Sequence, residues 1–349
     1  MAARKQLITD KYAIYHGDNC SVMPKLPSGS VHFSIYSPPF GGMLYQYSSD
    51  PADLSNSADY KEFFDHYTFV VNEIHRLTLP GRMTAVHCTD IFKSTGGEHT
   101  IIDFPGHIIR CHEENGWKYV ARIHIWKEPL TVRNRTMLNS LHHATMVEDS
   151  TMVSIANADY VLVFRRSGKN TIPVHHPVGL LNYAGSTEIP KEILKFKGHK
   201  GNQIENEYSQ WIWRQYASSN WHDIRIDNTL GKGAGLYSAN KADKEEPDEK
   251  HMHPLQLDVI ERAVVLWSNP GEVVLTPFLG IGSEVYGSVA NGRKAIGIEL
   301  KETYYRQAVE NLKQLAEADN PEDNPVKDQD GFEWGESEGE EAELEAVMD

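Results

Sequence analysis

The stretch Ser37-Pro38-Pro39-Phe40 combines residue types that can present fixed hydrogen-bond acceptors to a flat amine. It follows the run 31–36, in which apolar and polar residues alternate as in a β-strand. The two prolines cannot donate to a sheet, and each restricts the residue before it to extended backbone. Alone, such a pair indicates only a turn. The backbone carbonyls of Ser37 and Pro38, left without strand partners beside the ring of Phe40, would also suit a planar group that bears an amine.

A second stretch, far down the chain, favours a functional role for the first. Residues 276–283 place two glycines in a turn between a predicted strand and a predicted helix, and the next predicted strand ends in Glu299, 17 positions after Gly282. Glycines let the backbone approach a ligand, and a carboxylate at that strand tip can accept hydrogen bonds from both ribose hydroxyls. The pattern indicates a nucleoside-bearing cofactor. Because the turn holds only Gly280 and Gly282, no pyrophosphate cradle is predicted.

Four motifs in this order resemble one family. They are SPPF at Ser37, HPLQ at His253, TPFLGIGS at Thr276, and GIEL, which contains Glu299. The chain is similar to the DNA amino-methyltransferases that use S-adenosylmethionine, in the permuted β-group order. In that order the catalytic motif precedes the target-recognition region, and the cofactor motif follows it. The resemblance covers residues 10–316 and is thin from 165 to 250.

The resemblance implies a role for each motif. Ser37, Pro38, Pro39 and Phe40 would form the catalytic motif. The residues that would bind the cofactor are Asp18, His253, Pro254, Gln256, Thr276, Pro277, Phe278, Gly280, Gly282, Ser283 and Glu299. Among these, Glu299 would bind the ribose and the two glycines the methionine part, with the HPLQ residues at the methionine end. Asp18 would contact the adenine side, whereas the residue taken alone favours capping of the next short helix. No metal site is predicted.

Two positions depart from the family pattern. The cofactor motif usually begins with Asp, where this chain has Thr276, and usually has a small residue where this chain has Ile281. The first departure is expected to weaken cofactor binding. Neither removes the glycine turn.

The resemblance also implies a mechanism without a covalent intermediate. A sulfonium methyl group is already activated, so the enzyme has to hold an exocyclic amine in line with it. Acceptors on the amine hydrogens, here the Ser37 hydroxyl and the Pro38 carbonyl, stabilise the positive charge that develops on nitrogen. The base has to leave the duplex, and Phe40 would stack on it. Methylation of cytosine C5 needs a cysteine in a Pro-Cys setting, and none of the three cysteines has one.

The target base follows from the first residue of the catalytic motif. Serine there resembles the N4-cytosine enzymes, whereas Asp or Asn is commoner in the N6-adenine enzymes. We therefore expect cytosine N4, with adenine N6 as the alternative. An amino-methyltransferase acting on RNA or protein, and a silent relative that binds DNA without methyl transfer, also stay open.

The elements around these motifs indicate an α/β fold. Strands are predicted at 12–15, 31–36, 82–88, 117–126, 158–164, 272–275 and 294–298, and helices at 60–77, 104–115, 253–267 and 284–290. Strands that alternate with helices predict a doubly wound, Rossmann-like sheet with helices on both faces. Asp59 is the expected N-cap of the first of these helices, and Pro80-Gly81 is the expected turn after it.

The predicted organisation has four parts. Residues 10–165 would form the catalytic half of the methyltransferase domain and 251–316 its cofactor-binding half. Between them, 166–250 would be a target-recognition region, because basic residues there are interleaved with tyrosines and tryptophans. A small aromatic core with solvated lysines explains the same composition. The fourth part, 317–349, is an acidic tail.

Charge and cysteine content limit the possible partners and cellular location of the protein. The net charge is −15, yet 317–349 holds 14 acidic residues and one basic residue, so the rest of the chain is nearly neutral. The tail has the composition of a disordered segment. Three scattered cysteines and the lack of a signal peptide or membrane span predict a cytoplasmic protein with double-stranded DNA as partner. A homodimer and a restriction endonuclease partner are both compatible with the sequence.

Overall fold

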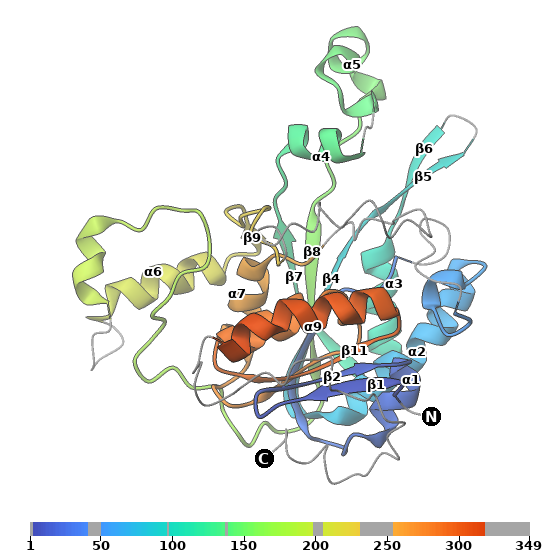
Figure 1. The fold of residues 1–349 in the computed structure, drawn as a ribbon. Helices are drawn as coiled ribbons and strands as arrows, with labels where there is room; N and C mark the ends of the chain where they lie inside the picture. The colour runs from blue at the N-terminus through green and yellow to red at the C-terminus, as the bar shows by residue number, and fades with distance from the viewer. Residues whose placement is uncertain are drawn as a thin grey trace.

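The computed structural model describes residues 3–40, 50–95, 98–136, 139–197, 205–230 and 254–317. His253, part of the predicted target-recognition region and the acidic tail lie outside these residues. Within the described part, nine strands form one sheet with helices packed on both of its faces (Figure 1). The predicted doubly wound, Rossmann-like α/β class is confirmed.

The sheet has the strand order β1-β2-β11-β10-β3-β4-β8-β7-β9. The strands are β1 Lys5–Ile8, β2 Tyr12–His16, β3 Val31–Tyr36, β4 Thr78–Thr89, β7 Trp117–Ile125, β8 Asp159–Arg166, β9 Asn220–Trp221, β10 Val273–Thr276 and β11 Lys294–Glu299. The five strands from β2 to β4 are parallel, whereas β1 and β8 run antiparallel to their neighbours. The carboxyl ends of the parallel strands therefore meet at one edge, where ligands bind in folds of this kind.

Helices cover the two faces in two groups. The α-helices of the described residues are α1 Asn19–Val22, α2 Tyr60–Leu77, α3 Phe104–Glu114, α4 Pro129–Thr136, α5 His143–Glu148, α6 Glu207–Tyr216, α7 Leu257–Trp267, α8 Ser283–Ala290 and α9 Glu302–Glu317, of which α4 and α5 do not cover the sheet (Figure 1). Alternate side chains of β3 explain the two layers: Tyr36 belongs to the core under α2 and α3, and Phe33 and Ile35 to the core under α7. The strand is therefore covered on both faces, and its polar Ser34 is buried as well, with its hydroxyl donating to Thr84 Oγ1 at 2.6 Å.

Helix α2 agrees with the sequence at both ends. It spans Tyr60–Leu77, and the Asp59 carboxylate accepts a hydrogen bond from the Glu62 backbone N–H at 2.8 Å. The following strand differs from the prediction. It begins at Thr78 and not at residue 82, and its pairing with β3 shifts register across Pro80-Gly81. The proline-glycine pair is thus a bulge inside β4 and not a turn before it, because Gly81 takes the left-handed φ of 77°.

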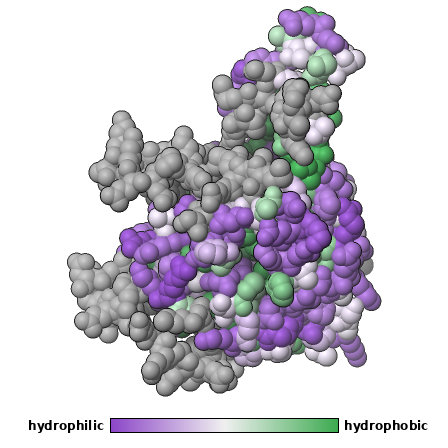
Figure 2. Space-filling view, turned by 90° about the vertical axis from the view of Figure 1, so that its right-hand side faces the viewer, coloured by the Kyte–Doolittle hydropathy of each residue, from purple (hydrophilic) through white to green (hydrophobic). Residues whose placement is uncertain are grey.

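Two projections that the sequence did not predict stand above the carboxyl edge (Figure 1). One is the hairpin of β5 (Ile91–Thr95) and β6 (Glu98–Ile102), and the other is the arm between β7 and β8 that carries α4 and α5. Several apolar side chains of the arm are exposed, among them Val147 at 67% and Ile155 at 79%. Figure 2 shows apolar residues in this upper part of the molecule, on a face that is otherwise mostly hydrophilic. No helix among the described residues has the length and apolar character to cross a membrane.

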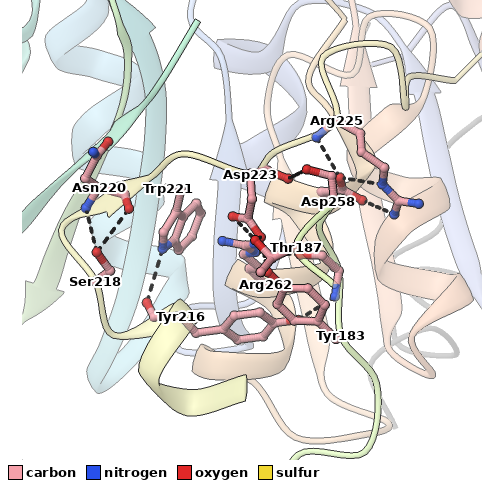
Figure 3. Close-up of polar contacts among 12 residues, drawn as sticks. Tyr183, Thr187, Tyr216, Ser218, Asn220, Trp221, Asp223, Arg225, Asp258 and Arg262 are labelled. Atoms are coloured by element: carbon pink, nitrogen blue, oxygen red, sulfur yellow. Dashed lines mark hydrogen bonds and ion pairs between the residues drawn. The ribbon is translucent and has the colours of Figure 1, made fainter. Parts of the chain in front are cut away.

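Segment 166–230 is fastened to α7 by a buried cation, Arg262 (Figure 3). The guanidinium donates to Asp223 Oδ1 at 2.8 Å and to the Ala184 carbonyl at 2.7 Å. The rings of Tyr216 and Trp221 lie over it, with centroids 4.9 and 5.1 Å away. Tyr216 and Tyr208 form a small core with Leu180 and Ile212, in keeping with the second explanation for this composition, whereas Trp221 belongs to the core between the sheet and α7. Strand β9 of the same segment pairs with β7 at the sheet edge.

Replacing Arg262 tests this anchor. Arg262→Met leaves the Asp223 carboxylate buried without its cation, so we expect the free energy of unfolding to fall by about 3–5 kcal/mol. The double variant Arg262→Met/Asp223→Asn should lose less, because no charge stays unpaired. Urea unfolding followed by circular dichroism measures both.

The matched control is Arg306→Met. Arg306 pairs with Glu302 on the surface, and its side chain is 71% exposed. Its loss should change stability by less than about 1 kcal/mol. Equal losses for the Arg262 and Arg306 variants would contradict the role given to Arg262.

Candidate active site

The catalytic and cofactor motifs meet because β3 and β10 are neighbours. The two strands pair in parallel, with Ser34 opposite Leu275. Ser37 leaves the carboxyl end of β3 and Pro277 leaves that of β10, so segments some 240 positions apart in sequence emerge at the same edge. Phe278 strengthens the junction, since its ring lies 5.9 Å from that of Tyr36.

The Ser37 hydroxyl is fixed by a histidine of the next strand. Its Oγ lies 2.9 Å from Nδ1 of His87, which is on β4 and only 5% exposed. The pairing of Tyr36 with Val86 places Ser37 beside His87 at the edge. A hydroxyl with a buried partner keeps one orientation, so its remaining hydrogen-bonding capacity has a defined direction.

The contacts continue across two more strands. His87 Nε2 lies 3.3 Å from Asp159 Oδ2, and Lys127 Nζ donates to Asp159 Oδ1 at 2.5 Å. Asp159 is the first residue of β8 and Lys127 follows β7. Burial acts to raise the pKa of the Asp159 carboxyl, but Lys127 and His87 outweigh it and hold the pKa well below its usual range. The sequence reasoning missed these three residues, because only the strand order brings them together.

Pro38 and Phe40, two of the other three residues of the SPPF motif, have different surroundings. Pro38 is buried, and among the described residues its carbonyl has no hydrogen-bond donor. Phe40 is half-buried, with its ring 6.3 Å from that of Phe104, and its carbonyl accepts a hydrogen bond from the Tyr60 hydroxyl at 3.2 Å. The structure thus places one acceptor, the Pro38 carbonyl, and the half-buried Phe40 close to Ser37 in the chain. The two glycines after Phe40 lie outside the described residues.

The glycine turn and Glu299 are bonded directly to each other. The Gly280 N–H donates to Glu299 Oε2 at 2.7 Å, and the Lys301 N–H donates to Oε1 at 2.9 Å. Gly280 and Gly282 have φ values of 55° and 95°, which a side chain would disfavour. Burial raises the pKa of Glu299 to about 7, against these two hydrogen bonds, which lower it. Each carboxylate oxygen retains a lone pair for a hydroxyl donor.

Asp18 lies at the same edge and caps a helix. Its carboxylate accepts hydrogen bonds from the Cys20 N–H at 3.1 Å and the Ser21 hydroxyl at 2.7 Å. The next residue, Asn19, donates from Nδ2 to the Pro277 carbonyl at 3.0 Å and ties the end of β2 to the glycine turn. Sequence reasoning missed this role of Asn19, whose only signal was its place shortly after the predicted strand 12–15. A contact of Asp18 with adenine remains a prediction.

Two buried polar atoms fit a ligand at this edge. Ser283 Oγ and Gln256 Oε1 have no hydrogen-bond partner among the described residues, and the two side chains are 2% and 8% exposed. Ser283 begins α8 directly after the glycine turn, and Gln256 precedes α7. Groups of this kind are normally satisfied, so a polar ligand is a reasonable partner. Pro254 lies two residues before Gln256, and no hydrogen bond described here joins it to the turn. Thr276 is buried and donates to the Phe278 carbonyl at 3.4 Å.

A second carboxyl lies close to Glu299. Glu284, in the first turn of α8, is 5% exposed. Burial, with a smaller contribution from the charge of Glu299, raises its pKa to about 8. The cofactor edge therefore holds two acidic groups whose charge changes near neutral pH.

Comparison with known proteins points to one family. A family model described as DNA methylase matches residues 31–310. The chain is 37% identical over 309 residues to the DNA adenine methyltransferase YhdJ of Escherichia coli (strain K12), covering 86% of this chain and 82% of that protein. It is 20% identical over 293 residues to the type II methyltransferase M.BglII of Bacillus subtilis, covering 83% and 66%.

Solved structures share the fold. The putative DNA modification methylase TTHA0409 of Thermus thermophilus, in complex with S-adenosyl-L-methionine, superposes with a TM-score of 0.55 at 19% identity, covering 87% of this chain and 96% of that one. The cytosine-N4-specific PvuII DNA methyltransferase superposes with a TM-score of 0.54 at 14% identity, covering 97% and 91%.

The contacts of Glu299 predict how S-adenosylmethionine binding depends on pH. Ribose hydroxyls can donate only to lone pairs that a proton does not occupy, so affinity should fall as pH drops from 8 to 6, through the raised pKa of Glu299. Glu299→Gln should raise the dissociation constant about 10- to 100-fold at pH 8 and flatten this dependence. Isothermal titration calorimetry of both proteins at each pH measures it. A variant that binds like the wild type would exclude Glu299 from the ribose site.

Glu284 gives a separate prediction for stability. Its pKa is about 8 in the folded protein and near 4.5 in the unfolded chain, so the folded state binds the extra proton between these values. Stability from this group is present at low pH and lost as pH rises toward 8. Glu284→Gln should melt like the wild type at pH 5 and about 5 °C higher at pH 9. A gain that is the same at both pH values would show that ionisation of Glu284 is not the cause.

Proposed function

Because this chain belongs to the DNA methylase family and is a DNA amino-methyltransferase of the N4-cytosine or N6-adenine kind, we propose that it methylates N4 of cytosine at specific DNA sites. The base is flipped out of the duplex, and S-adenosylmethionine is the methyl donor. The observation that carries the proposal is the neutral hydroxyl of Ser37, held by His87 at 2.9 Å, next to the buried Pro38. A hydroxyl and a carbonyl are two neutral acceptors for the two hydrogens of one amine.

The residues at the carboxyl edge of the sheet have separate roles in the proposed methyl transfer. Ser37 Oγ and the Pro38 carbonyl accept from the amine hydrogens, which keeps the nitrogen lone pair directed at the methyl group as positive charge develops. The exposed part of the Phe40 ring stacks on the flipped base. Bound S-adenosylmethionine supplies a methyl group on a sulfonium, which needs no further activation. Water has no role in this transfer, and the buried surroundings of Pro38 and His87 keep it out.

The cofactor would lie along the ends of β10, β11 and β2. Glu299 accepts from the ribose hydroxyls, and the backbone of Gly280 and Gly282 lies against the methionine part. Ser283 Oγ and Gln256 Oε1, both without a described partner, take its polar groups. Pro277 and Phe278 form the wall next to the catalytic motif, and Asp18 lies on the adenine side. The Thr276 hydroxyl donates to the Phe278 carbonyl in the same turn, and its side chain brings no charge to the site.

Adenine N6 is the second candidate target. Its support is the 37% identity to a protein named as a DNA adenine methyltransferase, over most of both chains. Both bases carry an exocyclic amine next to a ring nitrogen, so the same two acceptors serve either. Ser37 favours cytosine by resemblance at one position, whereas the relative favours adenine by similarity over the whole length.

The segment after β8 is the proposed target-recognition region. Its described part presents Trp213, 57% exposed, on a helix fastened through the Arg262 anchor. An exposed aromatic side chain beside basic residues suits contact with the duplex. A homodimer and a restriction endonuclease partner remain predictions, the second supported by similarity to a type II methyltransferase.

Genome sequencing in a host that lacks DNA methylation tests the proposal. Expression of the chain should produce N4-methylcytosine in one short sequence motif, detected by a method that separates it from N6-methyladenine. N6-methyladenine in one motif would establish the second candidate. The Ser37→Ala variant is the matched control and should reduce modification about 100-fold or more at equal protein level. An unmodified genome with folded, cofactor-binding protein would overturn both assignments.

A further inference from the structure

We propose that His87, Asp159 and Lys127 are positioning residues that make Ser37 a hydrogen-bond acceptor and receive the proton released by methyl transfer. The inference rests on the proposed function and holds for either base, since it concerns the amine alone. It stands on four residues in a row, one on or next to each of β3, β4, β8 and β7, joined by contacts of 2.9, 3.3 and 2.5 Å.

The charge on Asp159 sets the protonation of the histidine. Its carboxylate is buried, 4% exposed, and is kept ionised by the ammonium of Lys127. A buried carboxylate needs donors, and its second oxygen lies 3.3 Å from His87 Nε2, a buried atom that has no other polar partner among the described residues and makes no well-aligned hydrogen bond to Asp159 in this structure. The neutral imidazole carries one proton, and the carboxylate draws it to Nε2. Nδ1 is then left as an acceptor.

The tautomer in turn sets the direction of the Ser37 hydroxyl. With Nδ1 as acceptor at 2.9 Å, the serine O–H donates to His87. The lone pairs of Oγ then face away from the histidine, toward the position of the amine. A free hydroxyl can donate as well as accept, and a donated proton would compete for the nitrogen lone pair that has to attack. The row of residues therefore gives a neutral serine the acceptor character that a carboxylate has by itself.

The same row of residues can accept the proton that the methylated amine releases. In the transfer, the amine nitrogen forms a bond to the methyl carbon while the carbon–sulfur bond breaks and its electron pair stays on sulfur. The methylated nitrogen then gives one proton to Ser37 Oγ, whose own proton moves to His87 Nδ1. The resulting imidazolium pairs with Asp159 and later releases its proton to solvent. Histidine next to a carboxylate is well suited to this task.

A double-variant cycle on single-turnover transfer tests the proposal. The substrate is genomic DNA from a methylation-free host, with tritiated S-adenosylmethionine in excess. His87→Phe removes the acceptor for Ser37 and should slow transfer about 100-fold. Since His87 acts through the serine, adding His87→Phe to Ser37→Ala should slow that variant less than about twofold further. Cofactor affinity should stay within about twofold in each.

A second variant and a control separate this role from packing. Asp159→Asn has the same shape and no charge, so it should slow transfer about tenfold even if His87→Phe does not fold. His75→Phe alters another partly buried histidine, on α2 at the opposite edge of the sheet, and should leave the rate unchanged. The proposal is overturned if Asp159→Asn transfers at the wild-type rate. It is also overturned if His87→Phe slows transfer equally with and without the Ser37 hydroxyl.

Discussion

The parallel pairing of β3 with β10 is the contact on which the site depends. These strands come from opposite ends of the chain, yet Ser34 faces Leu275 across one ladder. Because parallel strands end at the same edge, the pairing places the acceptor motif after β3 beside the glycine turn after β10. In the proposed function, the first segment binds the amine and the second holds the methyl donor, so the two reacting groups would meet at this edge.

Local patterns in the sequence were sufficient for the elements that carry this pairing. Alternation in 31–36, the Asp59 cap and the spacing from the glycine turn to Glu299 each reflect interactions within a few residues or one strand–helix unit. They give β3, α2 and the β10–α8–β11 unit with bounds correct to about one residue. The exception was Pro80-Gly81. The pair does bend the backbone, but β4 pairs with β3 both before and after it, so the two residues form a bulge inside the strand.

The parts that were not predictable depend on contacts between distant segments. His87, Asp159 and Lys127 are ordinary residues near predicted strand ends, and only the antiparallel β8 between β4 and β7 brings them into one row. The ion pair of Arg262 could not be predicted for the same reason, because its partner Asp223 lies in a segment with no periodic pattern. The contact with His87 gives the Ser37 hydroxyl a fixed partner, which the motif alone cannot specify.

The most direct measurement is a crystal structure of the protein with its DNA site and a cofactor analogue that cannot transfer a methyl group. The account predicts a flipped base whose amine nitrogen lies within about 3.2 Å of both Ser37 Oγ and the Pro38 carbonyl oxygen. The amine should also lie in line with the analogue held by the glycine turn and Glu299. A base bound with its amine directed away from these two acceptors would contradict the account.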